Sequence, residues 1–380
     1  MSARANTPQV TVLLLAGVAS TSFFTLAPVL IGSLMDRMHL SVRAVGWVAS
    51  CQLTGSALGN LCMLLLGRKL CVCRTLAASL AAAGLANLAT LLARDLDMLL
   101  VCCLASGLAG GMAYSVVNAA AARLPRPGVM FAAISIAQML FGAIGFMTLP
   151  ALSARFGPGA IFATLGAYAL ACGVAAVRLT DVATVHDSDW RASLSVTARG
   201  AVLLVALFAI FLTGTAIWTH LERIGVAARL DSGVISIGLS LGMLAGILGA
   251  VGAAVVQLRG RHPDHFLVGG ATLLALSTAL LIKAASPAAY LVALCGFNAT
   301  QSFIIPLYLA RLAGETGGDA RILVALLAMY LGLIAGPLFG ASLVVNFDYQ
   351  ALILVAAASF AGASLLTLGA RRPSMQWVTP

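Results

Sequence analysis

Twelve long apolar stretches, each bounded by charged side chains, run through the 380 residues and limit what this chain can fold into. Eleven of them reach the roughly 18 residues that a helix needs to cross about 30 Å of hydrocarbon, and the ninth falls one residue short. Strands of a membrane barrel would alternate polar and apolar side chains, which these stretches do not do. The sequence therefore predicts an all-α membrane protein with twelve transmembrane helices, over residues 5–35, 44–67, 75–93, 98–122, 127–154, 156–177, 200–221, 232–258, 266–282, 284–310, 322–346 and 348–370.

The composition agrees with a chain that lies in a bilayer. Hydrophobic residues make up 61% of the chain and charged residues only 9%, whereas about 25% of a soluble domain is charged. The net charge of +10 does not indicate a nucleic-acid partner, because the basic residues lie in small groups between apolar stretches, without interleaved aromatics. The expected partners are the lipid bilayer and a small-molecule substrate, with no nucleic acid, and the chain is expected to be a monomer.

One polar run divides the apolar stretches into two sets of six. It predicts a six-helix bundle over residues 1–177, a cytoplasmic linker over 178–199, and a second six-helix bundle with a short cytoplasmic tail over 200–380. The first stretch is too long for the core of a signal peptide and is expected to be retained. With both termini in the cytoplasm, 15 of the 22 Lys and Arg residues lie inside, which favours this orientation in an inner membrane.

The two sets carry matching short segments at corresponding positions. Ala122-Arg123-Leu124 closes the fourth stretch and Ala310-Arg311-Leu312 closes the tenth, about half the chain later. A glycine followed by basic residues, at 67–69 and 260–262, follows the second and the eighth stretch. A parallel duplication of a six-helix unit is expected to leave such matches.

Taken together, six and six spans, a polar central loop and these short basic loops resemble the major facilitator superfamily of secondary transporters. In that family the loop after the second span carries a Gly, an Asp and a basic cluster; here GNLCMLLLGRK, at Gly59–Lys69, keeps the glycines and the basic pair but has no Asp. The eleventh span contains GLIAGPLFGA, which is similar to a packing motif of antiporter members. Its small residues and proline predict close helix packing and a bend, at Gly332, Gly336, Pro337 and Gly340.

The resemblance implies that the first, fourth, seventh and tenth spans line a central cavity. On those spans polar and aromatic side chains recur at helical spacing, and an amide in the middle of a span is expected to face protein or water rather than lipid. Interhelical hydrogen bonds, or hydroxyl bonds to the preceding turn, are the alternative explanation for these side chains. The candidate substrate-binding residues are Thr21, Phe24, Tyr114, Asn118, Thr215, Trp218, Asn298, Gln301 and Tyr308.

Three ionisable residues at the end of the seventh span, His220, Glu222 and Arg223, are candidates for coupling or gating. Ionisable groups in membrane segments are functional candidates in general, and histidine titrates in the physiological range. The alternative is that this end of the helix is simply anchored at the membrane interface, with Trp218 and Glu222 as the anchors.

Several functions are disfavoured by what the sequence lacks. There is no phosphate-binding Gly-rich loop, no nucleophile elbow and no His-Glu-x-x-His pair, so neither an enzyme nor an ATP-driven pump is predicted. Cys71 and Cys73 are spaced too tightly for a zinc clamp, and no paired methionines line a span, so we expect no cofactor and no metal. The eight cysteines are scattered and predict no structural disulfide.

No Asp, Glu, Lys or Arg lies in the central part of any predicted span, which disfavours phosphates and dicarboxylates as substrates. We therefore expect a secondary active transporter that moves a small neutral, amphipathic or weakly acidic organic solute across the inner membrane by alternating access, coupled to protons. Multidrug or toxic-compound efflux by proton antiport is the alternative within this class. A membrane receptor or assembly factor that keeps a transporter fold without transporting is the alternative from another class.

Overall fold

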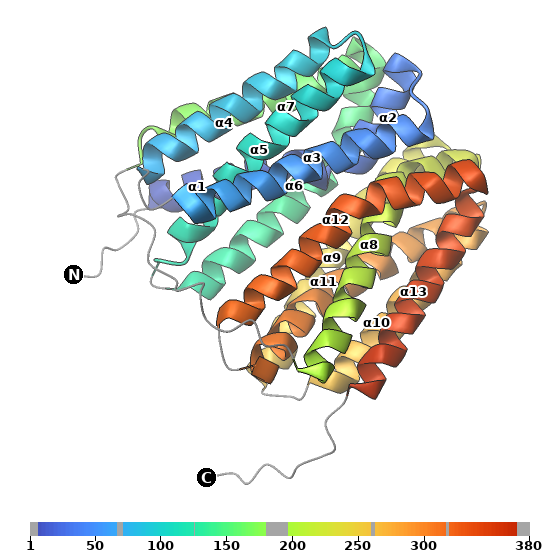
Figure 1. Ribbon diagram of the computed structural model, residues 1–380. Coiled ribbons are helices and arrows are strands. Elements are labelled where there is room, and N and C mark those ends of the chain that lie inside the picture. Colours follow the sequence, from blue (N-terminus) through green and yellow to red (C-terminus); the bar gives the residue numbers. More distant parts are fainter. Residues whose placement is uncertain are drawn as a thin grey trace.

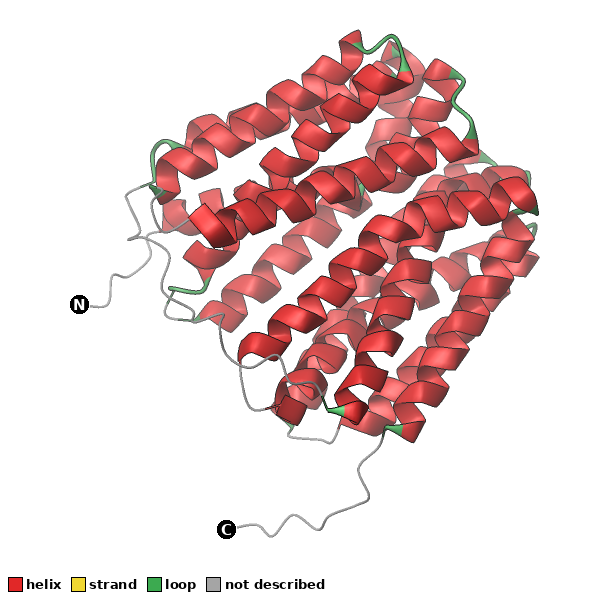
Figure 2. Ribbon diagram, in the orientation of Figure 1, coloured by secondary structure: helices red, strands yellow, loops and turns green. Residues whose placement is uncertain are grey.

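The computed structural model describes residues 7–66, 71–124, 126–179, 197–259, 263–316 and 319–370, and these residues form helices joined by short turns, with no strand among them (Figure 2). Most of the predicted linker, and the basic residues at 67–69 and 260–262, lie outside the described residues. The helices are α1 Thr7–Thr25, α2 Ala27–Met38, α3 Val42–Leu66, α4 Val72–Ala89, α5 Leu96–Ala121, α6 Pro127–Phe156, α7 Gly159–Ala176, α8 Ala198–Ala227, α9 Ser232–Leu258, α10 Pro263–Leu280, α11 Pro287–Thr316, α12 Asp319–Asn346 and α13 Tyr349–Gly369, with short 3₁₀ turns at Thr90–Leu92 and Leu281–Lys283.

In the described part of the chain, eleven helices are long and apolar enough to cross a membrane, and the bent pair α1 and α2 makes a twelfth span. The predicted fold class is thereby confirmed. The first span differs from the single helix expected over residues 5–35, because the chain bends by 51° between α1 and α2. Pro28 explains the break: its ring lacks the N–H that would continue the hydrogen-bond ladder, and it clashes with the preceding turn.

Helix ends depart from the predicted spans where a charged side chain was used as a boundary. The ninth span, α10, begins at Pro263, three residues before the predicted start at residue 266. Asp264 lies inside this helix, because its carboxylate is buried 2.7 Å from the Arg311 Nε of α11. α11 likewise continues past Arg311 and α8 past Glu222. An ion pair between neighbouring helices allows a charge to lie inside a helix, so the helix need not end there.

The thirteen helices pack as two groups, α1–α7 and α8–α13, which we call the N half and the C half; the boundary between them is the seam (Figure 1). Three helix pairs pack across the seam: α3 with α12, α6 with α9, and α2 with α8. The first residues of α1 and the last residues of α13 lie at the same end of the molecule, which we call the terminal end; the opposite end, where α2 and α8 finish, is the distal end (Figure 1).

The buried apolar core shows how the halves meet. One cluster contains the distal parts of α2, α3, α5, α6 and α7 together with apolar side chains along the whole C half. A second cluster contains only N-half residues, which come from the parts of α1, α3, α4, α5, α6 and α7 near the terminal end. Leu13, Met63 and Ile134 are among them. Among the described residues, the apolar core is therefore continuous across the seam at the distal end and interrupted at the terminal end.

The glycines of the eleventh span bring α12 close to α8. An added Cβ at Gly336 would lie 2.6 Å from the Leu212 carbonyl oxygen, and one at Gly332 would lie 2.8 Å from the Phe208 carbonyl oxygen. The next glycine, Gly340, faces the His220 ring in the same way, at 3.2 Å. Because backbone is the neighbour at the first two positions, a side chain there would force the helices apart.

Candidate functional site

A network of charged groups joins the two halves at the distal end. The Arg223 guanidinium of α8 donates to the Gly32 carbonyl of α2 at 2.5 Å and to the Asp36 carboxylate at 3.0 Å. The same guanidinium lies 2.9 Å from the Glu222 carboxylate of its own helix. We call Asp36, Glu222 and Arg223 the distal latch, because they tie α2 to α8. Of the predicted coupling or gating residues, Glu222 and Arg223 are brought together here; Asp36 was missed because it ends a span.

One turn below the latch, a second contact crosses the seam. The Trp218 indole N–H donates to the Phe24 carbonyl at 3.0 Å, and its ring packs edge-on against Phe146 with centroids 6.0 Å apart. In an unbroken helix the Phe24 carbonyl would accept from residue 28, but Pro28 has no N–H to give. The break in the first span thus supplies the acceptor for Trp218. Two predicted substrate-binding residues, Phe24 and Trp218, are joined by this bond.

His220 faces the C half rather than the seam. It is 1% exposed, its Nδ1 lies 2.8 Å from the Ala216 carbonyl oxygen, and its ring packs near Gly340 of α12 and Tyr349 of α13. Nδ1 must carry a proton to make that bond, so in the neutral ring Nε2 is an acceptor, and it has no hydrogen-bond partner among the described residues.

In the N half, the candidate residues Thr21, Tyr114 and Asn118 of the first and fourth spans are half-buried. The Thr21 hydroxyl accepts a hydrogen bond from the Gln138 amide of α6 at 2.9 Å and also donates within its own helix. Tyr114 and Asn118 lie one turn apart on α5, both half-buried. Gln138 was missed because it lies on the fifth span, which is not one of the four that the resemblance implies. An amide within an apolar stretch does, however, indicate a position that faces protein or water.

A chain of hydrogen bonds crosses the seam in the terminal half of α3. The Ser115 hydroxyl of α5 donates to the Asn60 carbonyl oxygen at 2.5 Å, and the Asn60 amide nitrogen donates to the Tyr330 hydroxyl of α12 at 2.6 Å. Nearer the distal end, the Ser50 hydroxyl donates to the Ile334 carbonyl at 2.7 Å. Ser50, Asn60 and Tyr330 were not predicted from the sequence, because they lie on the second and eleventh spans, outside the four that the resemblance implies. Ser115 lies on the fourth span but was not among the predicted residues.

The candidates on the tenth span lie within the C half. The Asn298 amide donates to the Leu294 carbonyl of its own helix at 3.0 Å, and the Gln301 amide nitrogen lies against Gly214 of α8. Thr215 is buried against Gly336. Tyr308 is fully buried, with its hydroxyl 2.6 Å from that of Thr367 on α13. The structure does not bring Tyr308 to the seam, since its hydroxyl is directed to Thr367 within the C half.

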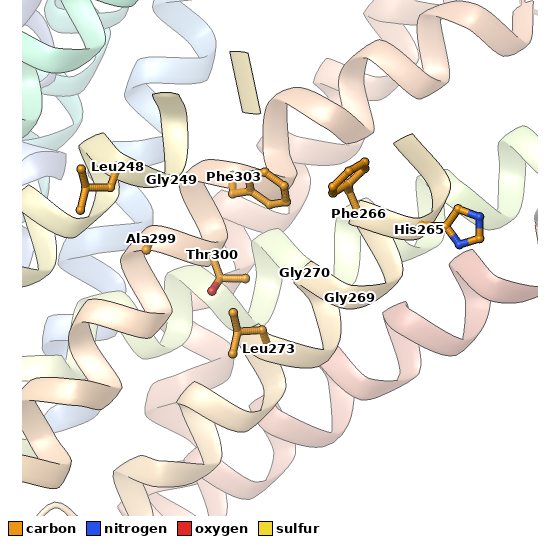
Figure 3. A pocket seen from close by; sticks show the side chains of 10 residues that line it. All are labelled: Leu248, Gly249, His265, Phe266, Gly269, Gly270, Leu273, Ala299, Thr300 and Phe303. Atoms are coloured by element: carbon orange, nitrogen blue, oxygen red, sulfur yellow. The ribbon is translucent and has the colours of Figure 1, made fainter. Parts of the chain in front are cut away.

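Two hollows in the described structure, one within the C half and one between the halves, contain no predicted substrate-binding residue. A groove of about 490 Å³ lies within the C half between α9, α10 and α11, lined mostly by apolar side chains, with His265 at one edge and Phe303 and Leu273 beside it (Figure 3). A cavity of about 400 Å³ lies at the distal end between the halves and is lined by Glu222 and Asp36 among others.

Between the latch and the terminal end, the described residues at the seam offer hydrogen-bonding groups and no charged side chains in the middle of a helix. Every charged residue of the described helices lies within five residues of a helix end. No group of three or more His, Cys, Asp or Glu that could hold a metal occurs among the described residues. The residues that cross or border the seam at mid-depth can donate and accept hydrogen bonds, and they offer aromatic surface, as at Phe24, which is 36% exposed.

Comparison with known proteins agrees with this architecture. The family model of the Major Facilitator Superfamily matches residues 12–321. The fold is similar to that of a mutant of the nucleoside transporter NupG, with a TM-score of 0.77 and 12% identity over 96% of this chain and 100% of that one. It is also similar to that of a D-xylose-proton symporter, with a TM-score of 0.72 and 14% identity over 95% of this chain and 96% of that one.

No curated protein sequence matches the chain. The family model nevertheless covers well over half of it, and the two fold neighbours extend along almost all of it. The chain therefore belongs to the Major Facilitator Superfamily and is a multi-pass membrane transporter rather than an enzyme.

Proposed function

We propose that this transporter moves a small, uncharged organic solute by alternating access, with the distal latch as the gate that is closed in this structure. The observation that carries the proposal is the apolar core, which is continuous across the seam at the distal end and interrupted at the terminal end. Alternating access requires two states in which opposite ends are closed. This distribution of buried side chains supports a state closed at the distal end.

The solute class follows from the groups at the seam. Thr21 with Gln138, and Asn60 with Ser115 and Tyr330, offer amide and hydroxyl groups at mid-depth. Charged solutes would need fixed counter-charges, which lie only near the helix ends. The two fold neighbours are described as carrying nucleosides and D-xylose, both uncharged molecules rich in hydroxyl groups. A nucleoside, a sugar or a similar polar neutral molecule fits these groups.

The moving parts are the N half and the C half, with residues 1–177 and 200–380 as the two bundles and 178–199 as their cytoplasmic link. For the distal end to open, Arg223 must leave Asp36 and Gly32, and Trp218 must leave the Phe24 carbonyl. Closing of the terminal end would then bring together the N-half cluster and the C half. In the proposed orientation the protein lies in the inner membrane with both termini in the cytoplasm. The distal end then faces away from the cytoplasm.

Coupling to protons is part of the proposal, with His220 and Glu222 as the candidate groups. His220 has a free Nε2 acceptor in a buried site one turn from the latch, and Glu222 shares the Arg223 guanidinium. Proton uptake at either group would change the charge balance around Arg223. The groups facing them from other helices are Asp36 of α2, Tyr290 of α11, whose hydroxyl bonds the Leu221 carbonyl, and Tyr349 of α13.

The transport prediction is tested by uptake of labelled nucleosides and pentoses into proteoliposomes that hold the purified chain. We expect Asn60→Leu and Gln138→Leu to lower the initial rate at least tenfold, because each removes a hydrogen-bonding amide from the seam. Gln257→Leu, the same kind of change at an exposed site on α9, is the matched control and should leave the rate unchanged.

Full activity in both amide variants would contradict the assignment of the seam as the substrate path. A pH gradient imposed across the same vesicles tests coupling. The wild type should respond to the gradient, and His220→Ala or Glu222→Gln should lose the response. Unchanged gradient dependence in both variants would remove these two groups from coupling.

A further inference from the structure

The distal cavity of about 400 Å³ takes its walls from both halves. The N half contributes α2, the end of α6 and the start of α7, with Val29, Asp36 and Ser153; the C half contributes α8 and α9, with Glu222, Ser236 and Leu239. Its lining residues lie on the distal parts of these helices, at the end of the molecule where α2 and α8 finish in Figure 1. A volume of this size is within the roughly 300–1,000 Å³ of small-molecule sites.

The charged side chains that line this cavity are acidic. Two carboxylates, Asp36 and Glu222, line it, and both pair with the single guanidinium of Arg223, which itself does not line it. Arg37 donates to the Thr90 and Leu91 carbonyls, Arg155 lies over the Phe156 ring, and Arg229 is exposed in the turn between the lining residues Val226 and Leu230. The three latch side chains together carry one formal negative charge, and the Asp36 side chain, at 65% exposed, can reach a ligand.

The rest of the lining is apolar with a few hydroxyls. Ile161, Ile235 and Leu239 are buried and form apolar wall, while Ser153 and Ser236 are half-buried. The Ser33 hydroxyl is already committed to the Pro158 carbonyl, at 3.0 Å. An anionic rim above an apolar interior suits a molecule with one cationic group and a short hydrocarbon body.

We propose that this cavity is a binding site for small amphipathic monocations, such as an arylalkyl ammonium ion, and that an occupant holds the transporter closed at the distal end. The ammonium group would pair with Asp36 and Glu222, and the hydrocarbon body would lie against the apolar wall. The effect on transport rests on the proposed function, whereas the binding does not.

The effect on conformation follows from the walls. When the distal end opens, α2 and α6 separate from α8 and α9, so the cavity exists only while that end is closed. A ligand that binds one state only shifts the equilibrium toward that state. The ion would therefore inhibit transport without being carried, and raising the solute concentration would not relieve the inhibition.

Phenethylammonium at pH 7 is a suitable probe, with 2-phenylethanol as a neutral molecule of nearly the same size. Binding to the purified full-length chain is measured by titration calorimetry, and inhibition by uptake into proteoliposomes. We expect the amine, and not the alcohol, to bind and to inhibit. Ser236→Leu fills the cavity without touching the latch and should raise the Kd for the amine at least tenfold.

Asp36→Asn should weaken binding to the same degree, and Asp97→Asn, which removes an exposed carboxylate of α5 from the same end, should not. Equal affinity in the wild type and in Ser236→Leu would overturn the site, as would equal binding of the alcohol or uptake of the amine beyond its passive entry into protein-free liposomes. A chain that carries its solute but binds no amine overturns the site alone. Binding with this variant pattern in a chain that carries none of the nucleosides or pentoses supports the site and overturns the solute class.

Discussion

Arg223 holds three acceptors on two helices at once, which depends on the shape of its side chain. Its guanidinium reaches the Gly32 carbonyl, the Asp36 carboxylate and the Glu222 carboxylate, and it is only 13% exposed. Lysine has the same charge but presents a single ammonium that does not fit a forked set of acceptors. Arg223→Lys should therefore weaken the closed distal end by about 2 kcal/mol, since a hydrogen bond to a charged group contributes roughly 1.5–3 kcal/mol.

The opening can be measured as the reaction rate of Ser153→Cys, in a chain without its native cysteines, with an impermeant maleimide added at the distal face. A loss of about 2 kcal/mol should raise that rate more than tenfold, because 1.4 kcal/mol corresponds to a factor of ten. Arg229→Lys, at an exposed position on the same face, is the control. Equal labelling rates in the wild type and in Arg223→Lys would show that the latch does not hold this end closed.

At the scale of single residues, sequence reasoning found the ionisable groups but not their partners. Glu222 and Arg223 stood out because charge is rare in this chain, whereas Asp36 looked like an ordinary helix end. The contact between Arg223 and Asp36 depends on how α2 packs against α8, and the spacing of residues along one helix does not predict it. Tyr308 shows the reverse case: the sequence showed its position on a polar helical stripe, but not its hydrogen-bond partner, Thr367 of α13.

The break between α1 and α2 couples the shape of an element to a contact across the seam. Restoring an N–H with Pro28→Ala should give the Phe24 carbonyl a donor in its own helix, in competition with the Trp218 indole. Trp218→Phe should then cost less in the Pro28→Ala background than in the wild type, by a coupling energy of about 1 kcal/mol. The same maleimide labelling rate gives the free energies for this double-mutant cycle. Additive effects would show that the proline and the indole bond are independent.

Helix boundaries were predicted from the positions of charged residues. This prediction was correct where the charged side chain is exposed to solvent. α9 fills its predicted span of residues 232–258, and Asp231 accepts a hydrogen bond from the Gly233 N–H at its start. The rule failed at Asp264 and Arg311, because the two side chains neutralise each other inside the bundle. A sequence alone does not tell a solvated charge from a paired one, so the predicted spans beside such pairs are too short.

For the molecule as a whole, the distribution of basic residues predicts which end faces the cytoplasm. Green fluorescent protein fused after Pro380 should fluoresce, and alkaline phosphatase at the same position should be inactive, because the phosphatase is active only outside the cytoplasm. Alkaline phosphatase fused after Arg229, at the distal end of α8, should be active. The opposite pattern would reverse the membrane orientation and place the latch on the cytoplasmic side.

The membrane spans were predictable because bilayer thickness sets helix length. The division at the polar run, into residues 1–177 and 200–380, stays a prediction. The arrangement of the seam was predictable only in part. The resemblance directed attention to four spans, yet Asn60 and Tyr330 cross the seam on the second and eleventh, and Gln138 reaches Thr21 from the fifth. Which helices from different halves touch depends on the conformation of the whole bundle, and a transporter has more than one.

The buried pair of Asp264 and Arg311 also bears on how the chain is made. A ribosome delivers α10 to the insertion machinery before the arginine of α11 has been synthesised, and the two residues are 47 positions apart. During that interval the aspartate has no ion-pair partner and stays near the lipid headgroups. We therefore expect α10 and α11 to insert into the bilayer together, as a hairpin, rather than one after the other. A nascent chain that stops between them would leave an acidic helix start exposed for quality-control proteases.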